Sequence, residues 1–79
     1  MTSIETFDIE CAEAQISSAV YAQTLAGEKL LASINRQVNG MASPELVEAA
    51  MAALVAAAIK TRDARRKHRE LKRLAKAAV

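Results

Sequence analysis

A single turn signal divides this chain into two long helical segments. Residues 39–44 contain the only proline and one of the two glycines. Gly40 suits the left-handed residue that follows many helix C-termini. Ser43 can cap the next helix, and Pro44 fits its first position, where a missing N–H costs nothing. The sequence therefore predicts one helix ending near residue 38, a turn over residues 39–43, and a second helix beginning at residue 44.

The first helix is predicted over residues 8–38, after an N-terminal tail of residues 1–7. Residues 2–5 match a capping box, so an earlier start is an alternative. Gln23 and Gly27 interrupt the apolar stripe, which indicates either close approach of the second helix or local weakness; the Ala-rich facing segment favours close approach. The predicted core face comprises Ile9, Ala12, Ile16, Val20, Gln23, Gly27, Leu30, Leu31, Ile34 and Val38.

The second helix is predicted over residues 44–78 and changes character in its middle. Residues 46–59 are apolar nearly all the way round, which is typical of a helix buried on more than one side. Residues 60–76 are strongly basic. The chain has a formal net charge of −5 over residues 1–59 and +7 over residues 60–79. Such segregated charge calls for a structural or functional explanation.

These features predict an all-α fold, an antiparallel two-helix hairpin forming a single domain. Facing residues should have numbers that add up to about 83, which places the basic segment beside the acidic start of the chain. We expect two hairpins to assemble into a four-helix bundle, most simply as an antiparallel dimer, or one hairpin to pack on partner helices. The core residues expected on the second helix are Leu46, Val47, Met51, Leu54 and Ala58.

A second, weaker apolar stripe lies opposite the first and indicates another contact surface. A helix in a simple hairpin needs only one apolar face, so aligned apolar side chains elsewhere favour a partner, although scattered surface hydrophobes are also normal. The partner would be another copy of the chain or a different helical protein. The residues expected at this protein interface are Phe7, Tyr21, Leu25, Leu46, Met51, Val55 and Ile59.

The basic segment supports an alternative function, nonspecific nucleic-acid binding, in which its side chains follow a phosphate backbone. No aromatic residue accompanies these charges, and no recognition module is visible, so a solvated or protein-facing surface is favoured. The apolar strip along the basic segment is too narrow for this helix to insert strongly into a membrane. The candidate anion or nucleic-acid contacts are Arg62, Arg65, Arg66, Lys67, Arg69, Lys72 and Arg73.

Reactive side chains are too few to predict an enzyme. The chain has one histidine and one cysteine, with no phosphate loop and no metal-ligand spacing, so no catalytic, cofactor or metal residue is expected. We expect His68 to be a solvated surface side chain and Cys11 to be a small packing residue. No signal peptide or membrane span is visible in the sequence, which favours the cytoplasm.

The expected function is that of a non-enzymatic interaction protein: a structural subunit, an adaptor or a small chaperone. In outline the chain is similar to small hairpins of bacterial secretion systems, such as type III needle subunits and their chaperones. Those proteins also pair two helices across a short turn in which proline precedes a leucine, here Pro44-Glu45-Leu46. The basic second helix departs from that pattern. The resemblance implies a secretion-system subunit or chaperone as a further alternative.

Overall fold

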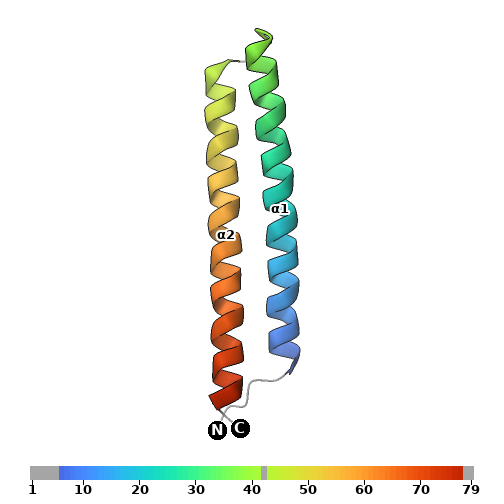
Figure 1. Cartoon of the computed structure of the whole chain (residues 1–79), viewed down its shortest axis with the longest axis vertical. Helices are drawn as coiled ribbons and strands as arrows, with labels where there is room; N and C mark the ends of the chain where they lie inside the picture. The colour runs from blue at the N-terminus through green and yellow to red at the C-terminus, as the bar shows by residue number, and fades with distance from the viewer. Residues whose placement is uncertain (1–5, 42, 78–79) are drawn as a thin grey trace.

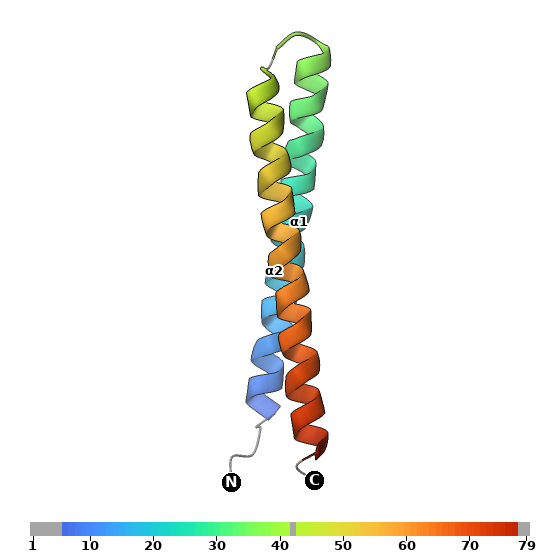
Figure 2. The same ribbon diagram turned by 90° about the vertical axis from the view of Figure 1, so that its left-hand side faces the viewer.

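Two long helices lie side by side and antiparallel in a computed structural model that describes residues 6–41 and 43–77 (Figure 1). Helix α1 spans Thr6–Val38 and helix α2 spans Pro44–Ala77, so the chain is the all-α hairpin that its sequence predicts. α1 includes Thr6 and Phe7, the last two residues of the expected tail. The possible capping box at residues 2–5, most of the expected tail, and residue 78 lie outside the described residues. The hairpin measures 60 × 14 × 12 Å, and Figure 2 shows α2 crossing over α1 along its length.

The turn ends α1 in the way the sequence predicts. Gly40 has a φ of 73°, the left-handed conformation that glycine adopts without strain. The Gly40 N–H donates to the Gln37 carbonyl at 2.9 Å, and the Met41 N–H donates to the Arg36 carbonyl at 2.7 Å. These two bonds form a Schellman motif, which satisfies carbonyl groups that the end of a helix leaves unpaired.

α2 begins at Pro44, but Ser43 supports it through its backbone. The Leu46 N–H donates to the Ser43 carbonyl oxygen at 3.1 Å, where the sequence predicts the Ser43 side chain as the acceptor. Glu45 stands in the first turn of α2 and Lys76 in the last, and each charge opposes the end of the helix dipole nearest to it. The start of α2 is therefore fixed by the proline and the dipole more than by a side-chain cap.

A seam of buried and half-buried side chains joins the helices and repeats at alternating steps of three and four residues. This spacing is the heptad pattern of a coiled coil, in which seven residues make two turns. The seam residues are Ile9, Ala12, Ile16, Ala19, Gln23, Ala26, Leu30 and Ser33 on α1, and Val47, Ala50, Leu54, Ala57, Thr61, Ala64, His68, Leu71 and Ala75 on α2.

Large and small residues alternate along this seam. On α1 every second seam position is Ala or Ser, and on α2 it is Ala from Ala50 to Ala64. His68 bonds Glu13 across the hairpin, so residues whose numbers add up to about 81 lie at one level. That register places Ile16 level with Ala64 and Ala26 level with Leu54. Most levels therefore join one large side chain to one small one, although Ile9 lies level with Leu71.

Part of the predicted core lies outside this seam. Leu31 is 64% exposed and Val38 is 80% exposed, and Val20 and Ile34 are also exposed, although all four were expected in the core. Leu46 and Met51 on α2 are exposed as well. The predicted stripe follows 3.6 residues per turn, whereas the seam follows 3.5, and the two diverge by about 20° per heptad. Over four heptads the stripe leaves the seam.

The two unusual central residues of α1 also differ from expectation. A Cβ atom added at Gly27 would meet no atom within 4 Å, so α2 does not approach this glycine closely. Gln23 is half-buried in the seam. Among the hydrogen bonds of the described residues, none joins Gln23 to α2, and the Thr61 hydroxyl instead donates to Ala57 of its own helix.

The turn geometry predicts a graded effect of substitutions at Gly40. Gly40→Ala should lower the free energy of unfolding by about 1–2 kcal/mol, because a Cβ atom strains the left-handed backbone. Gly40→Asn should cost less, since asparagine tolerates that conformation better. Urea denaturation followed by circular dichroism measures both changes. An alanine variant as stable as the parent would contradict the assigned role of this turn.

Candidate interaction surfaces

The hairpin buries very little of itself. Among the described residues only Ala12, at 2% exposure, and Thr61, at 5%, are buried. The accessible surface is 6049 Å², whereas a compact protein of 8.5 kDa exposes about 4,700 Å². The radius of gyration, 17.8 Å, likewise exceeds the roughly 12 Å expected for a compact domain of this length. Much of the apolar surface is therefore available to a partner.

One side of the hairpin carries six of the thirteen large apolar residues that are exposed in the described part of the chain; we call it the Leu31 flank. Its members occupy the heptad positions beside the seam on the same side of both helices. They lie in the half of the hairpin nearest the turn. The Leu31 flank comprises Val20, Thr24, Gly27, Leu31, Ile34 and Val38 of α1 with Glu48, Met51, Val55 and Ala58 of α2.

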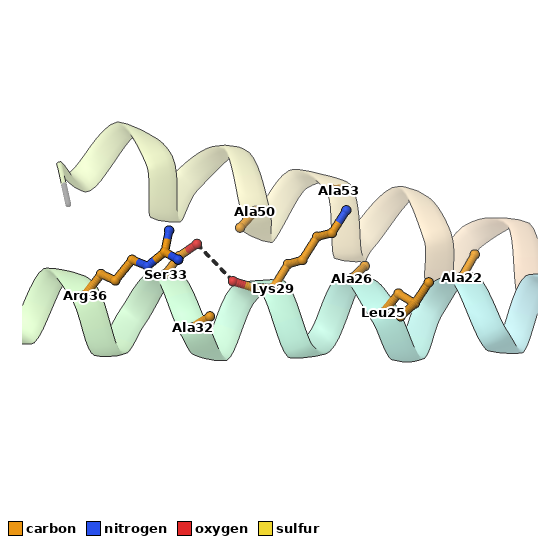
Figure 3. Close-up of a pocket in the computed structure, with 9 residues that line it drawn as sticks. All are labelled: Ala22, Leu25, Ala26, Lys29, Ala32, Ser33, Arg36, Ala50 and Ala53. Atoms are coloured by element: carbon orange, nitrogen blue, oxygen red, sulfur yellow. Dashed lines mark hydrogen bonds between the residues drawn. The ribbon is translucent and has the colours of Figure 1, made fainter. Parts of the chain in front are cut away.

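The opposite side, which we call the Leu25 flank, is a shallow groove lined mainly by alanine. Figure 3 shows its α1 side chains along the edge of the helix, with Leu25 among alanines and with Lys29 and Arg36 extending along the groove. Ala50 and Ala53 form its α2 side. Two cations in the groove make this flank more polar than the Leu31 flank. The groove is lined by Ala22, Leu25, Ala26, Lys29, Ala32, Ser33, Arg36, Ala50 and Ala53.

The seven residues predicted at an interface are all exposed, but they do not form one patch. Met51 and Val55 belong to the Leu31 flank. Leu25 and Leu46 lie on the opposite side, and the heptad places Phe7, Tyr21 and Ile59 on the outer faces, away from the seam. Sequence reasoning missed Leu31, Ile34 and Val20 as surface residues because it placed them in the core. The heptad spacing of the small residues Ala12, Ala19 and Ala26 is the signal that could have separated seam from flank.

The predicted anion contacts are exposed around the half of α2 that lies farthest from the turn. Four of them, with Lys76, form a row on the side of the Leu31 flank, spaced three or four residues apart: Arg62, Arg65, Arg69, Lys72 and Lys76. Arg66 and Arg73 lie on the outer face and Lys67 on the other side. The described residues of this end carry nine basic and five acidic side chains, so positive charge remains in excess.

Local ion pairs offset part of this charge. Arg73 pairs with Glu70 one helical turn away, as the spacing predicts, with Nη2 and Oε1 2.5 Å apart. The hydrogen bond and positive charge of Arg73 lower the pKa of Glu70, and Glu70 raises the pKa of Arg73 for the same reasons. Arg62 pairs with its neighbour Asp63, with Nη2 and Oδ1 3.4 Å apart. These pairs are exposed and add little stability.

His68 is not the solvated side chain that the sequence predicts. It occupies the seam with a side chain 15% exposed, and its Nε2 lies 3.3 Å from Glu13 Oε1 on α1. The predicted register placed it near Gln15, two residues away. Its highly charged neighbours concealed the position, although His68 continues the heptad of Leu54 and Thr61. Cys11, expected to pack, is exposed.

The seam position of His68 predicts a selective effect on stability. His68→Ala should lower the free energy of unfolding by about 1 kcal/mol, because it removes packing and the contact with Glu13. Lys67→Ala, on the neighbouring exposed position, should change stability by less than about 0.5 kcal/mol. Thermal and urea unfolding measure both. If the two substitutions lowered the free energy of unfolding equally, the imidazole of His68 would not be packed in the seam.

Within residues 6–41 and 43–77, no group of three or more His, Cys, Asp and Glu side chains is placed to hold a metal ion. Neither helix, over the same residues, has a stretch apolar and long enough to cross a membrane. No protein-family profile, curated protein or solved structure gives a significant match to this chain. The surfaces above are therefore the basis for a proposed function.

Proposed function

We propose that this protein is a self-associating helical hairpin whose function is to interact with other copies of itself, as a structural subunit or adaptor. The observation that carries this proposal is that the hairpin has more accessible surface than a compact protein of the same mass. The hairpin exposes roughly 1,300 Å² more than a compact protein of its mass. A standard protein interface covers about 800 Å² on each partner, so one such contact fits within that surplus.

The thin seam gives a second reason for association. Small domains with little core depend on disulfides, metals or oligomerisation for stability. The single cysteine excludes a disulfide within one chain. Association through exposed apolar side chains would bury the surface that the seam leaves in water, at about 25 cal/mol for each Å² covered.

Self-association predicts a mass and a melting temperature that depend on concentration. Sedimentation equilibrium should give a multiple of 8.5 kDa, and the melting temperature should rise with protein concentration, because only the folded state associates. A stable 8.5 kDa species with a constant melting temperature up to several hundred micromolar would refute self-association, leaving a different helical protein as the partner.

The excess positive charge at the end opposite the turn supports a second candidate function, nonspecific binding of a nucleic-acid backbone. The row from Arg62 to Lys76 runs along one side of α2, and a regular row of cations can follow a line of phosphates.

This second function predicts binding of duplex DNA at low salt that weakens steeply as salt rises. Arg65→Glu with Arg69→Glu should remove the binding. A charge reversal near the turn, Arg36→Glu, should leave most of it in place. Fluorescence anisotropy measures all three proteins. Absence of binding at about 20 mM salt would eliminate this function, since the electrostatic attraction is then scarcely screened.

A further inference from the structure

We propose that the partner of the Leu31 flank is the same flank of a second copy, with both turns at the same end of a four-helix bundle. This inference rests on the proposed self-association and specifies its geometry. A twofold axis along the hairpin would place α1 of each copy against α2 of the other. Neighbouring helices would all be antiparallel, as in an up-down-up-down bundle.

The register of the hairpin fixes which residues meet in this arrangement. Both copies run in the same direction, so residues with numbers adding up to about 81 also lie level across the new interface. Leu31 of one copy then faces Met51 of the other, and Gly27 faces Val55. All of these residues lie on the Leu31 flank; Leu31, Met51 and Val55 are exposed, and a Cβ atom at Gly27 would meet no atom within 4 Å. The large apolar side chains of the two flanks therefore cover each other, and Glu48 and Thr24 are the polar residues among them.

The same register pairs opposite charges at the end away from the turn. Glu13 of one copy lies level with Arg69 of the other, and Glu10 lies level with Lys72. Glu10 and Glu13 stand on the α1 side of this flank, and the cationic row stands on its α2 side. The twofold axis brings each acidic side to the basic side of the other copy. Charge complementarity of this kind sets the orientation of partners.

The reversed arrangement, in which the turns lie at opposite ends, matches these surfaces poorly. With the helices fully overlapped, α1 would pack on α1 and α2 on α2. Leu31 would then face Glu13, and Met51 would face Arg69. Burying charges against apolar side chains without partners is costly. The Leu31 flank therefore favours a dimer with both turns at the same end over the antiparallel dimer expected from the sequence.

The first test uses two matched substitutions and the mass in solution. Leu31→Glu places a carboxylate in the middle of the proposed interface and should reduce the mass from two chains to one. Leu25→Glu makes the same chemical change on the opposite flank and should leave the dimer intact. Both leucines are exposed in the hairpin, so circular dichroism should show unchanged helicity. Val55→Glu repeats the test from α2 if Leu31→Glu fails to fold.

The second test measures the orientation directly. A spin label at Ser43→Cys, in a Cys11→Ser background, marks the turn; Cys11 is the only cysteine, and the backbone of Ser43 makes the bond to Leu46. The two α2 helices lie diagonally across the bundle, about 14 Å or 1.4 interhelical spacings apart, so electron–electron distance measurements should give about 15–20 Å between turns once the labels' own length is added. The reversed dimer would give a distance near the 60 Å length of the hairpin.

The outcomes separate this inference from the proposed function. A parent protein that is always monomeric overturns both. A dimer that Leu25→Glu dissociates and Leu31→Glu does not, or a dimer with turns near 60 Å apart, overturns only the arrangement. Loss of the dimer in Leu31→Glu together with the short distance between labels supports it.

Discussion

The packing of one large side chain against one small one across the seam is the constraint on which the rest of this structure depends. Alanine at alternate seam positions brings the helix backbones together, and the residues opposite, such as Leu54 and Ile16, fill the remaining space. A seam between only two helices is narrow. Side chains that would be interior in a wider bundle, such as Leu31 and Met51, are therefore left at the surface.

The fold could be predicted from the sequence because its limits are set by local chemistry. Gly40 and Pro44 end and begin helices for conformational reasons that need no tertiary contact, and the rest of each segment contains no strong helix breaker. Which side of each helix faces the other was less predictable. It depends on the supercoil, and a small difference in period moves Leu31 and Val38 from the core to the surface over the length of α1.

For the interaction surfaces, too, one property could be predicted from the sequence and another could not: the exposure of the residues could, and their arrangement could not. Exposure of Phe7 and Tyr21 was predictable because they lie on a second apolar stripe opposite the predicted core face, and that of Val55 because its segment is apolar nearly all the way round. Their distribution over two flanks and two outer faces follows from the heptad and was not predicted. His68 shows the opposite error, since composition alone suggests a solvated residue, whereas its place in the heptad puts it in the seam beside Glu13. Composition predicts the average exposure of a segment, whereas the heptad position predicts the exposure of each residue in it.

In an antiparallel hairpin, the sequence separation between contacting residues increases with their distance from the turn. Contacts beside the Gly40 turn join residues about ten apart, while the contact of His68 with Glu13 joins residues 55 apart. Closing a longer loop costs more conformational entropy, so pairing is easiest next to the turn and proceeds outward from it. Most of the large exposed side chains of the Leu31 flank lie at that end, and the pairs of Arg62 with Asp63, His68 with Glu13 and Arg73 with Glu70 lie at the other. Loop-closure entropy thus favours folding that begins beside Gly40 and reaches the contact of His68 with Glu13 last.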